Sequence, residues 1–326
     1  MDRRGVIKGL GAGALSLTVP VKGAFAQGAA DYPKGPMHIY IGFPAGSGAD
    51  ILGRYFTNKL QEVSGKPVIV ENRPGATSNI ALGLVAKAKP DGYSILFSAN
   101  SNMAGSRYLF KDLPFDTVKD FTASATFAQI VFVVVVAPDS KFKTLGDLTA
   151  FLKTTDRAKY GYTNQTALLS AELYKSMAGV KAEPVSYRTA PDAMPDVTNG
   201  TLDFMVMDGT YAAGQIRAGR LKALAVTTAQ QSVSFPGVPT MQEAGLAGFE
   251  FAPWWCAYFP KGTPQDIVDK FGGWLTQIAK TEETAKFLAS VGAIPLAENA
   301  KQADARLLSD IEKWAPIVKA ANIQPQ

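Results

Sequence analysis

Short apolar segments with strand character alternate with amphipathic helical segments along most of the chain, and this alternation restricts the available folds more than any other feature. The first unit has strand patterns over 39–43 and 68–71, with a helical pattern over 49–64 between them. Alternating periods of this kind are typical of an α/β fold with a largely parallel sheet. We therefore expect an α/β chain.

A second alternating series begins with a continuous apolar strand expected over 129–138, and an aromatic strand over 249–259 leads into three closing helices. A chain of 326 residues exceeds what one core usually supports, so we predict two lobes, each a mixed sheet flanked by helices. Lobe 1 is expected to comprise residues 33–134 and 252–326, and lobe 2 residues 135–251. The two strands that cross between the lobes would form a hinge.

The first 26 residues have the features of an export signal. Arg3 and Arg4 precede a mildly apolar run, and a small-residue cleavage site ends at Ala26, before Gln27. The paired arginines favour the twin-arginine route. We expect a periplasmic mature chain that does not insert into the membrane, because its other apolar runs are far shorter than the roughly 20 residues that span a bilayer.

The segment from Phe43 to Asp50 is a candidate anion site. It leaves a strand, passes through Pro-Ala-Gly-Ser-Gly and enters a helix. Gly46 and Gly48 allow close approach to the backbone, and helix N-termini bind anions through free N–H groups. A plain turn is the alternative. A dinucleotide site is disfavoured because Ile51 stands where that fingerprint needs its third glycine.

Few residues here are suited to catalysis or to metal binding. The single histidine, His38, lies near the start of a strand, away from the strand ends that form a cleft. Cys256 is the only cysteine, and we interpret it as a buried small hydrophobe. We expect no enzyme activity, no cofactor and no metal. The net charge of +5 lies mostly in the leader, so we also expect no nucleic-acid partner.

Polar residues follow one strand directly, and aromatic residues occupy a predicted crossover. Ser98, Asn100 and Ser101 come at the carboxyl end of the strand over 93–98, where open α/β sheets bind ligands. Trp254 and Trp255 lie on the aromatic segment, and both core packing and ligand stacking remain open for them.

Six motifs in order along the chain carry a family resemblance. They are GFPAGSGAD at 42–50, VENRPGA at 70–76, KPDGY at 89–93, AGRLKALAVT at 218–227, PGVPTMQEAG at 236–245 and PKGTP at 260–264. Together they resemble the periplasmic substrate-binding proteins of tripartite tricarboxylate transporters, the Bug family. The resemblance implies a type II periplasmic-binding-protein fold. It also implies a receptor, expected to be monomeric, that closes on a small mono- or dicarboxylate, aliphatic or aromatic, and delivers it to a membrane permease. A sensory receptor that docks on a membrane kinase is the alternative.

The resemblance also implies a ligand site between two facing loops whose backbone amides hold one carboxylate. Arg188 would pair with a distal carboxylate, or it would remain exposed or bridge the lobes. Asp208 would accept a ligand hydroxyl or amine, or it would cap a helix. The expected ligand contacts are Phe43, Ala45, Gly46, Ser47, Gly48, Asp50, Thr77, Ser78, Asn79, Ser98, Asn100, Ser101, Thr163, Asn164, Gln165, Thr166, Tyr187, Arg188 and Asp208.

Overall fold

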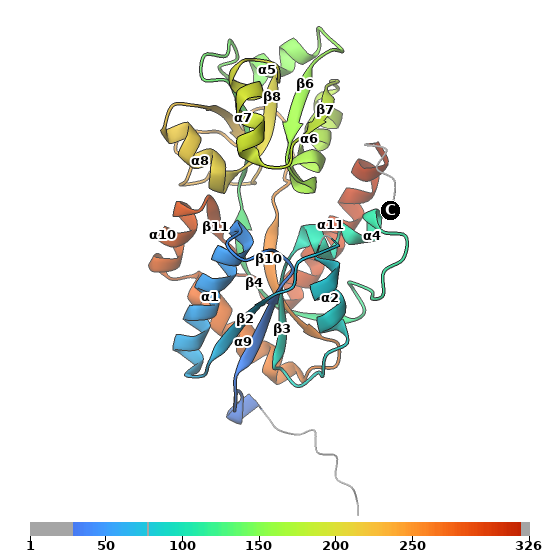
Figure 1. Cartoon of the computed structure of the whole chain (residues 1–326), viewed down its shortest axis with the longest axis vertical. Coiled ribbons are helices and arrows are strands. Elements are labelled where there is room, and N and C mark those ends of the chain that lie inside the picture. The colour runs from blue at the N-terminus through green and yellow to red at the C-terminus, as the bar shows by residue number, and fades with distance from the viewer. Residues whose placement is uncertain (1–28, 77, 321–326) are drawn as a thin grey trace, which may run out of the picture.

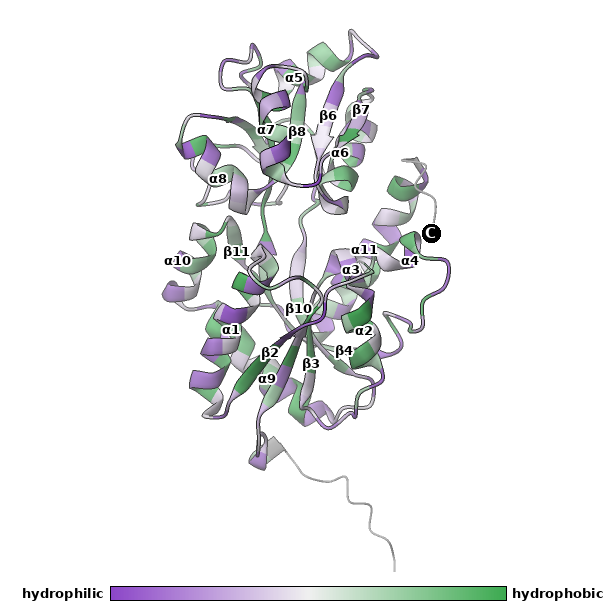
Figure 2. Ribbon diagram, viewed as in Figure 1, coloured by the Kyte–Doolittle hydropathy of each residue, from purple (hydrophilic) through white to green (hydrophobic). Residues whose placement is uncertain are grey.

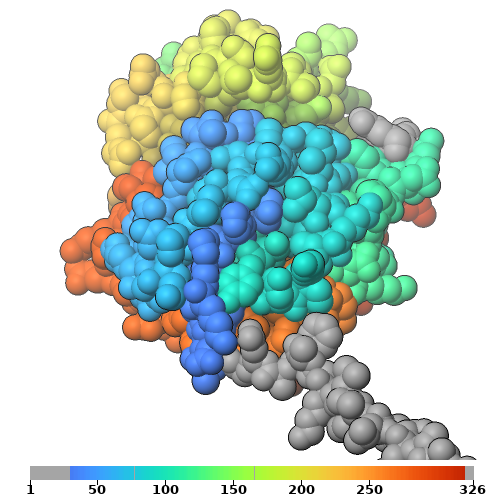
Figure 3. Space-filling model, turned by 60° about the horizontal axis from the view of Figure 1, so that its bottom comes forward, coloured from blue at the N-terminus to red at the C-terminus, as the bar shows by residue number. Residues whose placement is uncertain are grey.

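The computed structural model describes residues 29–76 and 78–320, and these form two sheets, each flanked by helices, in two lobes (Figure 1). This confirms the predicted fold class. The predicted export signal and Thr77 lie outside the described residues. The lobe boundaries expected at residues 134 and 251 stay a prediction. Segments from both ends of the described chain share one lobe, so blue and orange surfaces adjoin there in Figure 3.

The first sheet has six strands in the order β11-β4-β10-β3-β1-β2. Strands β1, β2 and β3 are parallel, and β10 runs antiparallel to β3 and β4. The strands are β1 (Met37–Ile41), β2 (Val68–Asn72), β3 (Ser94–Ala99), β4 (Phe121–Ile130), β10 (Trp254–Pro260) and β11 (Ala293–Pro295).

Alternate residues of β3 face opposite sides of this sheet, so two sets of helices cover it. Ile95 and Phe97 pack with α1 (Gly48–Ser64) and α9 (Gln265–Ala279), whereas Leu96 packs with α2 (Asn79–Ala86) and α11 (Ala300–Ala320). Figure 2 shows apolar residues on β2 and β3, pale colour on β10, and a mixture of polar and apolar residues on the outer helices. The other helices of this lobe are η1 (Ala29–Asp31), α3 (Asn100–Met103), α4 (Ser106–Leu109) and α10 (Glu282–Ser290).

The second sheet has five strands in the order β7-β6-β8-β5-β9, and β5 is antiparallel to both neighbours. Val133 and Val135 of β5 pack on one face with α7 and α8, and Val134 belongs to the cluster on the other face with α5 and α6. The elements are β5 (Phe132–Val136), α5 (Leu145–Leu152), β6 (Lys159–Tyr162), α6 (Gln165–Ala178), β7 (Glu183–Ser186), α7 (Ala190–Thr198), β8 (Phe204–Asp208), α8 (Gly209–Arg217) and β9 (Lys222–Val226).

The crossover between the sheets differs from the expectation of one continuous strand over 129–138. Strand β4 ends at Ile130 and β5 begins at Phe132, so Val131 lies between the sheets. The Val131 N–H donates to Gly292 O at 3.0 Å, and its carbonyl accepts from Gly209 N at 2.8 Å. The aromatic strand is also shorter than expected, because β10 begins only at Trp254.

The C-terminal helix α11 contacts both lobes. It packs on β4 of the first sheet and on α6 of the second lobe, and Figure 1 shows it rising toward that lobe. Within residues 29–76 and 78–320, no helix combines the length and the apolar character needed to cross a bilayer.

Candidate ligand-binding cavity

A cavity of about 290 Å³ lies between the two lobes. The first lobe contributes the loop before α1, the end of β3 and the start of β10, and the second contributes the N-termini of α6 and α8 and the start of β5. The lining residues are Phe43, Ser47, Gly48, Ala49, Ala99, Ser101, Asn102, Ile130, Phe132, Asn164, Thr166, Asp208, Thr210, Pro253 and Trp255.

Three helices of nine or more residues begin at this cavity. In each, the residue before the helix caps it: Ser47 Oγ accepts from Asp50 N, Asn164 Oδ1 from Ala167 N, and Asp208 Oδ1 from Thr210 N. The first N–H groups of an α-helix have no partner within the helix, and the helix dipole makes this end positive. The described lining residues include no cationic side chain, so the suitability of the cavity for an anion rests on these helix ends.

Asp50 holds the loop before α1 in place. Its carboxylate accepts from Gly46 N at 2.8 Å, from Arg54 Nε at 2.9 Å and from Asn72 Nδ2 at 2.9 Å. Asn72 Nδ2 also donates to Phe43 O at 3.0 Å. Burial by itself would raise the pKa of the Asp50 carboxyl, but the hydrogen bonds from Arg54, Gly46 and Asn72 outweigh it and lower the pKa below its ordinary value. Asp50 is thus a structural support for the loop.

Replacing Asp50 by asparagine is expected to lower the free energy of unfolding at pH 7 by about 1–3 kcal/mol, because charge-assisted hydrogen bonds are lost. The folded pKa of Asp50 lies below the unfolded value of about 3.9, so its contribution is present above that pH and is lost as the pH falls through the folded pKa. Urea unfolding of both proteins from pH 7 to pH 3 checks this.

A matched control is Asp31→Asn, which removes an exposed carboxylate paired with Lys34 at 3.4 Å. Exposed pairs of this kind contribute little, so a change below about 0.5 kcal/mol is expected. A gap between wild type and Asp50→Asn that persists undiminished at pH 3 would contradict the charge-based explanation.

The other wall of the cavity is apolar. Phe43, Phe132 and Trp255 line it together with Ile130 and Pro253. The Phe43 and Trp255 rings lie 5.6 Å apart between centroids. This wall is suited to the hydrocarbon part of a ligand.

Among the lining residues that the structure describes, Asp208 is the one with a charged side chain. Burial raises the pKa of its carboxyl, although hydrogen bonds from the hydroxyl and the N–H of Thr210 oppose the shift. Both bonds hold the carboxylate at the start of α8. Asp208 therefore caps a helix, one of the two roles left open by the sequence, while it faces the cavity.

The structure brings some of the predicted ligand contacts to this cavity and directs others elsewhere. The predicted residues that line it are Phe43, Ser47, Gly48, Ser101, Asn164, Thr166 and Asp208. The predicted residues absent from its lining are Ala45, Gly46, Asp50, Ser78, Asn79, Ser98, Asn100, Thr163, Tyr187 and Arg188, and the side chain of Gln165 is not among those that the structure describes. Thr77 lies outside the described residues.

Several of these residues have other partners. The Gly46 N–H is taken by Asp50, Ser78 Oγ donates to Gly42 O, and Asn79 Oδ1 accepts from Ser106 Oγ. Tyr187 donates to Asp196 at 2.6 Å. Arg188 is exposed and is not among the residues that line the cavity, so the structure does not place it to pair with a distal carboxylate there.

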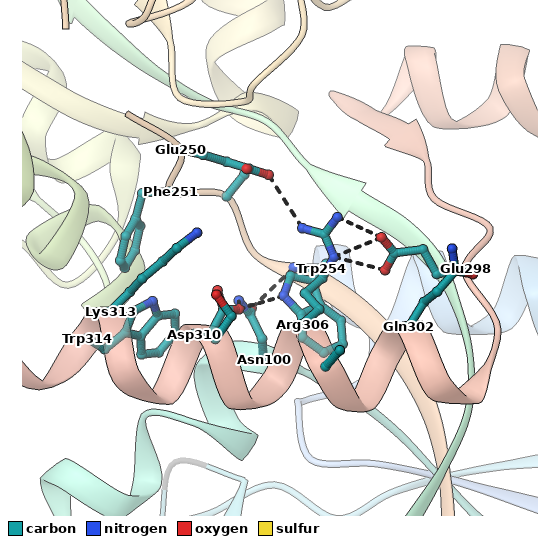
Figure 4. Close-up of a pocket in the computed structure, with 13 residues that line it drawn as sticks. Asn100, Glu250, Phe251, Trp254, Glu298, Gln302, Arg306, Asp310, Lys313 and Trp314 are labelled. Atoms are coloured by element: carbon teal, nitrogen blue, oxygen red, sulfur yellow. Dashed lines mark hydrogen bonds and ion pairs between the residues drawn. The ribbon is translucent and has the colours of Figure 1, made fainter. Parts of the chain in front are cut away.

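Asn100 lines a second cavity, of about 380 Å³, instead (Figure 4). There Asp310 accepts from Asn100 Nδ2 and from Trp254 Nε1, each at 2.7 Å. Arg306 pairs with Glu250 and with Glu298 in the same cavity. Asp310 and Arg306 therefore both have partners within the protein.

Trp255 and Phe132 are the most informative lining residues that the sequence did not identify as contacts. The available signal was the alternation of side chains along an extended segment. Ala252 and Trp254 line the second cavity, whereas Pro253 and Trp255 line the cavity between the lobes. Choosing between the two tryptophans required knowing which face the segment presents to the cleft.

Comparison with known proteins points to one family. A family model described as tripartite tricarboxylate transporter family receptor matches residues 52–323. A protein from the tcbD-tcbE intergenic region of Pseudomonas sp. (strain P51) is 31% identical, over 98% of this chain and 94% of its own length. BugT of Bordetella pertussis is 28% identical, over 94% of this chain and 95% of its own.

Solved structures agree. Rpa4515 of R. palustris, determined with adipate, has a TM-score of 0.77 at 27% identity, covering 91% of this chain and 100% of that one. The periplasmic binding protein BugD has a TM-score of 0.72 at 27% identity, covering 90% and 100%.

Proposed function

Because this chain belongs to the family of tripartite tricarboxylate transporter receptors, we propose that it captures a small organic carboxylate between its lobes and delivers it to a membrane permease of that transporter class. The family consists of periplasmic solute-binding receptors and not of enzymes, and this chain is one of those receptors. We also propose that the predicted leader directs its export and is removed near Ala26.

The observation that carries the proposal is the meeting of three helix N-termini at one cavity. Helices α1, α6 and α8 come from both lobes, so an anion bound at their ends would hold the lobes together. A carboxylate fits because it offers two acceptor oxygens to N–H donors. The cavity needs no lysine or arginine for this purpose.

The apolar wall of the cavity determines which kind of group the ligand carries beyond its carboxylate. A hydrocarbon chain or an aromatic ring would pack on Phe43, Phe132 and Trp255. The adipate in Rpa4515 supports an aliphatic carboxylate as one class to test. A volume of about 290 Å³ favours a ligand of modest size.

A thermal-shift and calorimetric screen of aliphatic and aromatic carboxylates tests the proposal. A carboxylate at about 100 times its dissociation constant should add roughly 2.7 kcal/mol of stability. Replacing Gly46 by valine should weaken binding about tenfold, because its φ of 79° costs a residue with a side chain about 1–2 kcal/mol and the loop before α1 shifts.

Gly65→Val is the matched control. Gly65 has a φ of 66° at the far end of the same helix, and open space surrounds both glycines. The control should lose similar stability and keep full affinity. No response of the wild type to any carboxylate would overturn the proposed function.

A further inference from the structure

The carboxylate of Asp208 lies at the cavity between the lobes with one of its two oxygens unused. Oδ1 accepts from the Thr210 N–H at 2.7 Å and from the Thr210 hydroxyl at 2.5 Å. Oδ2 has no partner within the described part of the chain, and it is not one of the fully buried polar atoms there. Met207 and Gly209 on either side are buried whereas Asp208 is half-buried. Since Asp208 lines the cavity, this free acceptor is accessible from it.

No cationic side chain compensates the charge of Asp208. The described lining residues include no lysine or arginine. Burial raises the pKa of the Asp208 carboxyl, and the two groups that oppose this shift both belong to Thr210, so no charged neighbour takes part. A carboxylate removed from water without a cationic partner costs free energy. In a ligand cavity, such a group indicates what the ligand supplies.

The three helix ends at the cavity differ in what they offer. In α8, the first two N–H groups are already used, by the carbonyl of Val131 and by the carboxylate of Asp208. In α1, the N–H groups of Gly48 and Ala49 have no acceptor among the described residues, and the same holds for Thr166 in α6. All three of these residues line the cavity. Helices α1 and α6 therefore offer free donors to a carboxylate, whereas α8 presents a carboxylate of its own.

We infer that Asp208 Oδ2 accepts a hydrogen bond from a protonated amino group of the ligand, so that the ligand is an amino acid. This inference rests on the proposed function, because the ligand carboxylate binds at the ends of α1 and α6. A ligand without a cation would bring a second negative charge close to Asp208 in a cavity that has no cationic side chain among its described lining residues. A hydroxyl would use the free oxygen and leave both charges uncompensated. An ammonium group does both.

The two charged groups of this ligand lie close together. A Cβ on Gly48 would lie 3.9 Å from Thr210 Oγ1, which is 2.5 Å from Asp208 Oδ1. The free donors of α1 and the acid of α8 thus face each other across a short distance. This favours an amino acid whose amino group and carboxylate are on the same carbon or on adjacent carbons. Its side chain would pack on the apolar wall, so we expect an aliphatic or aromatic one.

Two sets of matched probes test the inference by calorimetry on the mature protein at pH 7. Each set keeps one scaffold and changes the amino group to a hydroxyl and then to hydrogen. The aliphatic set is L-leucine, L-2-hydroxy-4-methylpentanoate and 4-methylpentanoate, and the aromatic set is L-phenylalanine, L-3-phenyllactate and 3-phenylpropanoate. In at least one set, wild type should bind the amino acid about ten- to hundredfold more tightly than either partner.

Asp208→Asn removes the charge and keeps a side-chain oxygen that can cap α8, so it should reduce this preference to within about threefold. Asp192→Asn is the matched control. The Asp192 carboxylate accepts from the N–H and the hydroxyl of Thr189 at the start of α7 in the same lobe, and it is absent from the cavity lining. This control should retain the full preference for the amino acid.

The possible failures are distinguishable. If no carboxylate of any kind binds to wild type, the proposed function fails and the inference falls with it. If other carboxylates bind and these amino acids do not, or if a hydroxy acid binds as tightly as its amino acid, the inference alone is overturned. Retention of the preference in Asp208→Asn would show that Asp208 is not the partner of the amino group. Should Asp208→Asn fail to fold, the comparison of end groups on wild type decides.

Discussion

Replacing Phe127 by alanine is expected to lower the free energy of unfolding by about 3–5 kcal/mol. The Phe127 ring is fully buried at the centre of the first lobe. Its centroid lies 4.6 Å from that of Phe56 on α1, 4.7 Å from Phe97 on β3 and 6.4 Å from Trp255 on β10. The alanine variant leaves a void between elements that are far apart in sequence, so little local collapse can fill it.

Urea denaturation followed by circular dichroism measures this loss. Phe287→Ala is the control, because Phe287 is only partly buried and stacks on Tyr55 at 3.9 Å away from the sheet centre. It should cost about 1 kcal/mol. Similar losses in the two variants would show that the rings around Phe127 do not form the stabilising centre of this lobe.

Replacing Gly209 by alanine is expected to weaken carboxylate binding about tenfold to hundredfold. A Cβ at this position would lie 2.5 Å from Val131 O and 3.0 Å from Gly292 O, both on the backbone. Backbone atoms cannot rotate away, so the start of α8 must move away from Val131 at a cost of about 1–3 kcal/mol. Asp208 and Thr210 would move with it, and the anion site would lose one of its three helix ends.

The same helix supplies the control. Gly214 is exposed, and a Cβ there meets no atom within 4 Å. Gly214→Ala should therefore add about 0.5–1 kcal/mol of stability and leave binding unchanged. Calorimetry with L-leucine and with 4-methylpentanoate compares the three proteins. Wild-type affinity in Gly209→Ala would mean that the hinge contact tolerates a side chain and does not position the site.

Much of the fold could be predicted because periodic apolar patterns and turn residues are local signals. The strand over 121–130 was missed because its alternating alanine, serine and threonine residues give a weak apolar period. Pairing with β10 and β11 stabilises this segment as a strand, which its own side chains do only weakly. The break at Val131 was missed because an apolar run carries no mark of where a chain passes between two sheets.

The site was harder to predict than the fold because some of its side chains form hydrogen bonds with residues that are far away in sequence. The motifs indicated the loop before α1 and the loop before α6 as ligand contacts, and residues of both loops line the cavity. Asn100, however, donates a hydrogen bond to Asp310, which lies 210 positions away in sequence. A pairing of that kind depends on the assembled lobe. The Gly46 N–H donates to Asp50, four positions along the chain, and the residue types of the loop do not reveal that bond.

The peptide groups of Val131 link the crossover between the two sheets to the cavity between the lobes. The N–H of Val131 donates to Gly292 O in the first lobe. Its carbonyl accepts from the N–H of Gly209, the first residue of α8. A bend of the chain at Val131 would therefore change the direction in which the N-terminus of α8 points at the cavity. If the lobes rotate about this residue, the angle between them and the affinity for an anion would change together, and the proposed carboxylate would hold the lobes at one angle.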